Sequence, residues 1–123
     1  GILFQLQDDY LDVFGEENIF GKVSGGDIKE NKRTLFFIHS IENGSKEDVK
    51  SLLNLYSSES KDFEKKKRKV VNIFKKNKSD VYLRNIIENY NQKILNLINN
   101  LPIEIKKQKQ FFDLFKTILN RKL

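Results

Sequence analysis

The segment from Asp80 to Leu101 constrains the fold most, because its apolar residues recur at alternating spacings of four and three. Residues spaced in this way share one face of an α-helix, which has about 3.6 residues per turn. The pattern predicts a long amphipathic helix with one apolar seam. Coiled-coil pairing is the alternative, but such a seam inside a helical protein is more often core packing. The seam consists of Leu83, Ile87, Tyr90, Ile94, Leu97 and Leu101.

Weaker helical patterns occupy the rest of the chain. They run from the N-terminus to a break at Gly15, within 29–42, from Ser45 to Tyr56, within 61–78 and from Ile103 to about Asn120. The prediction is an all-α fold in which residues 1–123 form a single all-helical segment.

Three local signals suggest where helices begin and end. Ser45 with Asp48 has the spacing of a capping box. Ser79 is the expected N-cap of the long helix, and Pro102 is expected to stop that helix and start the next one. We expect the last helix to bury its apolar residues Phe111, Leu114, Phe115 and Ile118.

The composition excludes several kinds of site. The chain has no cysteine, which excludes disulfides and thiolate metal sites, and its single histidine, His39, excludes histidine zinc clusters. No apolar run approaches the ~20 residues needed to cross a bilayer, and there is no signal-peptide pattern. We expect a cytoplasmic protein without an integral membrane segment.

Three carboxylates crowd the first predicted helix. Asp8 and Asp12 lie one turn apart on one face, Asp9 lies beside them, and Gln5 is one turn earlier. Such crowding is unfavourable unless a cation lies among the carboxylates. Magnesium suits this donor set, because it takes one or two carboxylates together with substrate phosphates and water. Acid pairs at this spacing are also common on solvated helix faces, which is the alternative interpretation.

The next residues favour the metal interpretation. After Gly15 comes EENIFGKVSGGDIKENK, in which Gly21, Gly25 and Gly26 permit unusual backbone angles. Lys22 and Lys32 lie near the two ends of this segment. Acids that hold a metal, followed by a glycine loop and lysines that neutralise phosphate oxygens, suit a metal-bridged polyphosphate.

The same residues resemble a known family. FQLQDDYLDVFG followed by FGKVSGGDIKENK is similar to the second aspartate-rich motif and following loop of the trans-isoprenyl (polyprenyl) diphosphate synthases, which make farnesyl, geranylgeranyl and longer diphosphates. The resemblance runs in order through Phe4-Gln5, Asp8-Asp9, Asp12, Gly21-Lys22, Asp27-Ile28 and Lys32. After Lys32 only the helical pattern and the closing LNRKL continue it.

The resemblance implies a fold, a reaction and a set of site residues. The fold would be the C-terminal part of an isoprenoid-synthase-type helical bundle. The activity would be that of a prenyltransferase that condenses isopentenyl diphosphate with an allylic prenyl diphosphate and depends on Mg²⁺. The metal ligands would be Asp8, Asp9 and Asp12, with Asp8 the strongest candidate for direct contact. Gln5, Lys22 and Lys32 would contact the diphosphate, and no single residue is assigned as catalytic.

The family also has an earlier aspartate-rich motif and basic residues that hold isopentenyl diphosphate, and neither has a counterpart in this sequence. The sequence therefore predicts a C-terminal fragment of a polyprenyl synthetase domain that is inactive or nearly so by itself. For the full-length protein we expect a homodimer, as in relatives.

Two other classes of function rest on weaker signals. A noncatalytic helical interaction module would keep the same sequence without activity. A basic RNA-binding helical protein would suit the net charge of +6 and the run KKKRK at residues 65–69. No aromatic-interleaved nucleic-acid motif accompanies that run, so a solvated helix face is the better interpretation and nucleic acid is not an expected partner.

Overall fold

The computed structural model describes residues 2–15, 25–57 and 61–119, and every regular element in these ranges is an α-helix. The all-α prediction is therefore confirmed. None of the helices in these ranges is long and apolar enough to cross a membrane. The helices are α1 (Ile2–Phe14), α2 (Gly26–Lys29), α3 (Leu35–Asn43), α4 (Lys46–Ser57), α5 (Phe63–Lys76), α6 (Ser79–Asn99) and α7 (Ile105–Leu119).

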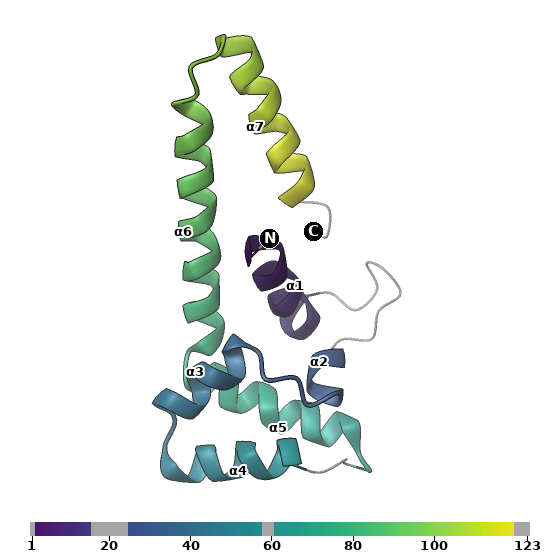
Figure 1. Ribbon diagram of the computed structural model, residues 1–123. Helices are drawn as coiled ribbons and strands as arrows, with labels where there is room; N and C mark the ends of the chain where they lie inside the picture. The colour runs from purple at the N-terminus through teal and green to yellow at the C-terminus, as the bar shows by residue number, and fades with distance from the viewer. Residues whose placement is uncertain (1, 16–24, 58–60, 120–123) are drawn as a thin grey trace.

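The helices build an elongated molecule with a broad base (Figure 1). α4 and α5 lie at the base, with α2 and α3 above them, and α6 extends away from this end. α1 packs against α6 and α2, while α7 turns back beside the far end of α6. The acidic helix α1 therefore ends directly above the base.

Phe36 is the centre of the core. Its ring is fully buried on α3 and lies 5.4 Å from Phe74 of α5 and 5.3 Å from Phe14 of α1, measured between ring centroids. Tyr10 of α1 contacts the same ring at 6.0 Å. Aromatic rings at these separations attract one another in addition to excluding water. One side chain thus fixes α1 relative to α3 and α5.

The apolar stripe of α1 explains why this segment is helical and how it is oriented. Leu3, Leu6 and Val13 are buried on one side of the helix, and helical spacing brings them onto that side together. The helix ends where the Gly15 N–H donates to the Leu11 carbonyl over 2.8 Å. A side chain at Gly15 would collide with that carbonyl, so glycine permits this ending.

Several local predictions can be compared with the helix boundaries. Ser45 does cap α4, because its hydroxyl accepts a hydrogen bond of 3.1 Å from the Asp48 N–H. The helix expected within 29–42 begins only at Leu35, as α3, because α2 has already ended at Lys29. Asn31, which follows α2, has a φ of 57°, a left-handed conformation that a right-handed helix cannot include.

The expected boundaries around α6 are wrong in two respects. Lys78, with a φ of 56°, is the N-cap, and Ser79 is the first helical residue. The Ser79 hydroxyl is fully buried and lies 2.8 Å from both His39 Nδ1 and Ser40 Oγ of α3. Pro102 follows the end of α6 but does not start α7, which begins at Ile105.

The prediction that the last helix buries its apolar face is also wrong. Phe111 is 50% exposed, Leu114 57% and Ile118 36%, and only Phe115 is half-buried. The seam of α6 changes in the same direction, from the fully buried Leu83 to Leu97 at 68% exposure. These apolar residues stay exposed because, among the described elements, α7 packs mainly against α6, and one neighbouring helix covers only part of its surface.

Gly25 is hydrogen-bonded to α1 through its N–H, which donates to the Asp12 carbonyl, and we expect it to tolerate substitution poorly. Its φ of 86° is left-handed, and a Cβ there would lie 3.1 Å from Lys67 Cδ and 3.3 Å from Phe63 Cζ. We predict that Gly25→Ala lowers the free energy of unfolding by about 1–2 kcal/mol, the cost of a left-handed non-glycine residue. Urea denaturation measures this change.

Gly26→Ala is the matched control, because Gly26 starts α2 and its φ is not left-handed. A Cβ at Gly26 has one near neighbour, Asp12 Oδ1 at 3.3 Å. We expect a clearly smaller loss for this variant. Equal losses at both positions would show that the backbone conformation of Gly25 is not the cause.

Candidate functional site

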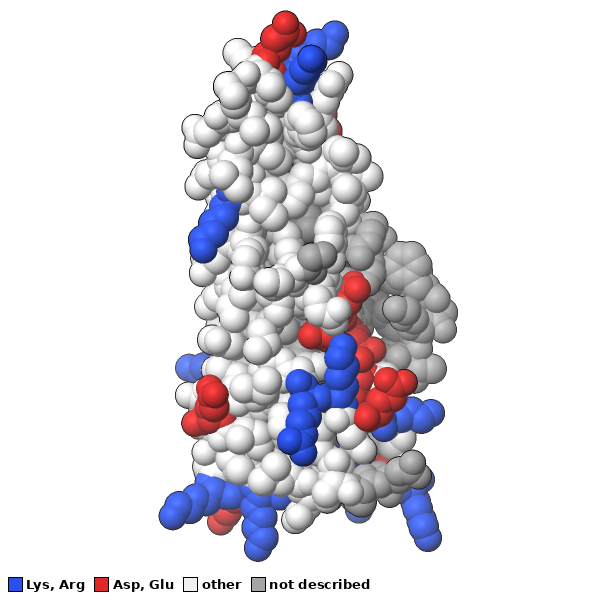
Figure 2. Space-filling model, in the orientation of Figure 1, with Lys and Arg blue, Asp and Glu red and all other residues white. Residues whose placement is uncertain are grey.

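The candidate site lies where the acidic side of α1 meets the start of α2. The Asp12 carboxylate accepts a hydrogen bond of 2.9 Å from the Asp27 N–H, and the Asp12 carbonyl accepts one of 2.6 Å from the Gly25 N–H. These two bonds hold the Gly25–Asp27 turn against α1. Figure 2 shows the acidic and basic side chains that gather at this level of the molecule.

Asp9 is the most buried carboxylate of the cluster, at 7% exposure. Its Oδ1 accepts a hydrogen bond of 2.9 Å from Gln5 Nε2 on the same helix. The same oxygen lies 3.2 Å from the Lys32 ammonium, with which it forms a salt bridge. Gln5 and Lys32, both predicted diphosphate contacts, are therefore positioned by Asp9, a predicted metal ligand.

Asp27 completes a group of three carboxylates with Asp9 and Asp12. Burial raises the pKa of Asp27 above its usual value, and the negative charges of Asp12 and Asp9 raise that pKa further. The Lys32 ammonium acts in the opposite direction. The hydrogen bond to Asp9 raises the pKa of Lys32 in turn. Among the described residues, the cluster thus carries more negative charge than Lys32 balances, which favours a further cation.

The donor chemistry fits magnesium bound jointly with phosphates. The described residues contain no group of three or more His, Asp or Glu side chains arranged to hold a metal by themselves. Asp8 and Asp12 lie one turn apart on α1, both half-buried, and Asp27 faces Asp12 from α2. One or two carboxylates, completed by substrate oxygens and water, are what Mg²⁺ commonly uses.

A buried lysine supports the site from below. Lys66 of α5 is 3% exposed, and its ammonium donates a hydrogen bond to Asn31 Oδ1. It also lies 5.6 Å from the ring centroid of Tyr56, an attractive cation–π distance. Burial, together with the charges of Asp27 and Asp12, raises the pKa of the Tyr56 hydroxyl. Lys66 therefore connects the base to the residue just before Lys32.

The structure brings most of the predicted site residues together. Gln5 and Lys32 are both hydrogen-bonded to Asp9. Asp8 and Asp12 lie on the neighbouring side of α1. Lys22 and Gly21 lie outside the described residues.

Sequence reasoning missed Asp27 and Lys66 as parts of the site. Asp27 follows the glycine pair directly, which was an available signal. Lys66 was hidden within a run assigned to a solvated face, although helical spacing places it with Val70 and Ile73 on the buried side.

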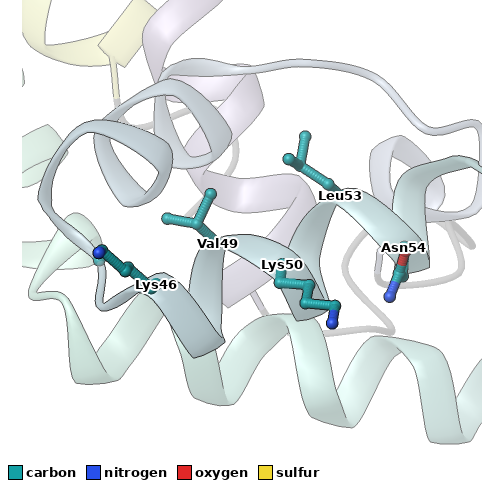
Figure 3. Close-up of a pocket in the computed structure, with 6 residues that line it drawn as sticks. Lys46, Val49, Lys50, Leu53 and Asn54 are labelled. Atoms are coloured by element: carbon teal, nitrogen blue, oxygen red, sulfur yellow. The ribbon is translucent and has the colours of Figure 1, made fainter.

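A separate hollow lies along α4. Its volume is about 390 Å³, and Figure 3 shows the side chains that line it. It is open to solvent and contains none of the predicted site residues. The lining residues are Gly44, Lys46, Val49, Lys50, Leu53 and Asn54.

Comparison with known proteins places the carboxylate cluster in a family. Residues 1–74, which include the whole candidate site, match the family model for polyprenyl synthetase. The chain belongs to the polyprenyl synthetase family. The resemblance of the aspartate-rich motif is confirmed by this match.

Curated relatives are isoprenyl diphosphate synthases. The chain is 36% identical to the farnesyl pyrophosphate synthase of Nezara viridula over 121 residues, covering 98% of this chain and 28% of that enzyme. It is 41% identical over 58 residues to the short chain isoprenyl diphosphate synthase of Methanothermobacter thermautotrophicus, covering 47% and 18%. The chain thus spans less than a third of the length of these relatives.

Solved structures confirm the isoprenoid-synthase fold. A geranylgeranyl pyrophosphate synthase structure superposes with a TM-score of 0.85 at 35% identity, covering all of this chain and 38% of that one. The geranylgeranyl pyrophosphate synthetase of Pyrococcus horikoshii gives a TM-score of 0.84 at 30% identity, with coverages of 98% and 36%.

The raised pKa of Asp27 predicts how stability depends on pH. The folded chain binds this proton more tightly than the unfolded chain, whose pKa stays near 3.8. The contribution of Asp27 to stability therefore falls as the pH rises from 3.8 through the raised pKa. Asp27→Asn cannot ionise and keeps the N–H that bonds to Asp12. We expect its advantage over the wild type to grow across this window and then level off at roughly 0.5 kcal/mol, the scale of a like-charge pair.

Urea denaturation of both proteins from about pH 3.5 to 7, without metal, checks this expectation, since the linkage relation fixes its sign. A stability difference that stays constant with pH, or that shrinks as the pH rises, would contradict the assigned electrostatics.

The Asp9–Lys32 pair predicts a second stability effect. Lys32→Met leaves the buried Asp9 carboxylate with Gln5 but without its cation, and we expect a loss of about 1–2 kcal/mol in the free energy of unfolding. Because the pKa of Lys32 is raised, the stability that the Asp9–Lys32 pair contributes is fully present below pH 10.5 and is lost as the pH rises through the raised pKa. Chemical denaturation near pH 7 gives the main effect.

Lys76→Met is the matched control. Lys76 forms a salt bridge of 3.1 Å with Asp48, but its side chain is 67% exposed, against 45% for Lys32. Exposed pairs contribute about 0.2–1 kcal/mol. We therefore expect Lys32→Met to be the more destabilising variant. A larger loss for Lys76→Met would contradict the idea that the burial of Asp9 makes its salt bridge with Lys32 important.

Proposed function

We propose that the protein that carries this chain is a short-chain polyprenyl diphosphate synthase. It condenses isopentenyl diphosphate with an allylic prenyl diphosphate in a reaction that depends on Mg²⁺. The observation that carries the proposal is the carboxylate cluster of Asp9, Asp12 and Asp27, joined to Lys32 in a fold shared with geranylgeranyl pyrophosphate synthases. The sequence of this chain forms the C-terminal part of the enzyme.

The reaction transfers the allylic group from an oxygen of its diphosphate to a carbon of isopentenyl diphosphate. The allylic carbon–oxygen bond breaks and its electron pair leaves with the diphosphate. The double bond of isopentenyl diphosphate then forms a bond to the allylic carbon, and loss of a proton restores a double bond. The main demand on the protein is therefore to stabilise negative charge on the departing diphosphate.

The cluster meets this demand through two groups of residues. Asp8 and Asp12 would hold Mg²⁺ together with diphosphate oxygens and water, and Asp27 would add negative charge beside them; the ion, when bound, neutralises charge on the diphosphate oxygens. Lys32 would donate to the same diphosphate. Asp9 keeps the Lys32 ammonium at this side of α1 and also bonds to Gln5, which places a second polar donor nearby. Lys22 remains a predicted diphosphate contact.

Asp9 is better suited to positioning than to direct metal binding in this arrangement. Its buried Oδ1 already accepts hydrogen bonds from Gln5 and Lys32. A metal at that oxygen would have to replace one of these donors. The proposed ligand set therefore gives Asp8 and Asp12 the direct role, either by contact or through water, with Asp27 next to Asp12.

Magnesium-dependent binding of a diphosphate tests the proposal. We expect the purified chain to bind a nonhydrolysable allylic diphosphate analogue in the presence of Mg²⁺, measured by isothermal titration calorimetry. Asp12→Asn with Asp27→Asn should weaken that binding by at least about tenfold, since even the loss of a group that only supports a metal ligand typically costs about 10–100-fold. Prenyl transfer by the chain alone is not expected.

A charge-matched control separates site effects from loss of negative charge. Glu104→Gln with Asp113→Asn removes two exposed carboxylates outside the cluster, and this variant should bind as the wild type does. Binding that both double variants lose equally, or binding that does not require Mg²⁺, would contradict the proposed site.

A further inference from the structure

The outward face of α5 carries a row of basic side chains, which we call the basic stripe: Lys65, Arg68, Lys69, Lys75 and Lys76. Each is exposed. The buried side chains of α5 are Lys66, Val70, Ile73 and Phe74, and helical spacing places them opposite the stripe. Along the helix the stripe extends over about 16 Å, given ~1.5 Å per residue.

The N-terminal half of the stripe carries its available charge. Lys76 is bound to Asp48 at 3.1 Å, and the Lys75 ammonium lies 5.9 Å from the ring centroid of Phe14. Lys65, Arg68 and Lys69 project from consecutive turns of the same face. Glu64 is the one acidic side chain on α5, so the face as a whole is strongly positive.

The stripe belongs to a basic end of the molecule. Figure 2 shows blue side chains projecting from the base, where α4 and α5 lie side by side, while much of the face above is white. α4 carries the exposed Lys46 and Lys50, whose charge its own Glu47 and Asp48 balance, so the positive charge of this end comes from α5. Leu53 lies beside these lysines at 45% exposure. Figure 3 shows these side chains at the hollow along α4.

Two kinds of polyanion could bind this basic end, a single-stranded RNA or an anionic bilayer, and the exposure of aromatic side chains distinguishes between them. Sequence-tolerant binding of single-stranded RNA relies on exposed aromatic rings on which bases stack. In the described parts of α4 and α5, Tyr56 and Phe74 are buried and Phe63 is half-buried. Several lysines and arginines on one helix face, without a stacking surface, instead suit the headgroups of an anionic bilayer.

We propose that the basic stripe of α5 is an electrostatic docking surface for anionic phospholipid bilayers. The opposite side of the same helix holds Lys66 against Asn31, next to the carboxylate cluster. A bilayer that contacts the stripe therefore leaves the candidate site on the other side of α5. The proposal is independent of the proposed enzymatic function, because none of its residues belongs to the cluster.

Sedimentation with lipid vesicles tests the docking surface. We expect the chain to bind vesicles that contain about 30% phosphatidylserine and not vesicles of phosphatidylcholine alone. Raising the salt from about 0.05 to 0.5 M should abolish binding, because the screening length becomes shorter than the reach of the side chains. The triple variant Lys65→Glu, Arg68→Glu, Lys69→Glu should bind at least about tenfold more weakly.

The control variant makes the same change of charge elsewhere. Lys106→Glu, Lys107→Glu, Lys109→Glu alters three exposed residues of α7 and should keep most of the vesicle binding. Circular dichroism checks folding, and Lys65→Gln, Arg68→Gln, Lys69→Gln replaces the reversal variant if that variant unfolds. Equal losses in the α5 and α7 variants, or no binding of the wild type, would overturn the proposal. Tighter binding to a single-stranded RNA oligonucleotide than to the anionic vesicles would also overturn it.

Discussion

Two carboxylates of α1 organise the part of the protein on which its chemistry depends. The Asp12 carbonyl accepts a hydrogen bond from the Gly25 N–H, and the Asp12 carboxylate accepts one from the Asp27 N–H. One turn earlier, Asp9 holds the Lys32 ammonium. These bonds fasten the segment 25–32 along one helix, so Asp27 and Lys32 lie beside Asp12 and Asp9. Gly25 makes the turn compatible with this arrangement, since its left-handed φ disfavours other residues and a side chain would crowd Lys67 and Phe63.

The same cluster stores electrostatic repulsion that a ligand can relieve. The pKa of Asp27 is raised by burial and by the charges of Asp12 and Asp9, while Lys32 offsets only part of the negative charge. A magnesium ion accompanied by a diphosphate would bring both a cation for the carboxylates and an anion for the lysine. The arrangement therefore favours the pair of ligands over either one alone, in agreement with the proposed function.

The base of the molecule has a different electrostatic character from the site. α5 turns one lysine, Lys66, inward to Asn31 and Tyr56, and it turns the basic stripe outward. The inward lysine is buried among aromatic and polar partners, while the outward ones remain hydrated. One run of five basic residues thus divides between two environments because successive residues of a helix point about 100° apart.

The sequence by itself determined the helical class, most helix positions and the family, because apolar spacing and the aspartate-rich motif are local properties of the chain. It also predicted that Gln5, Asp8, Asp9, Asp12 and Lys32 share one site, and the structure brings Gln5 and Lys32 into contact with Asp9. Only the tertiary structure decided that Asp9 binds Lys32, that Asp27 joins the cluster and that Lys66 is buried, since each depends on contacts between distant segments. It also decided that Phe111 and Leu114 stay exposed. An apolar stripe indicates which face of a helix can be buried, but burial itself requires a neighbour that covers that face.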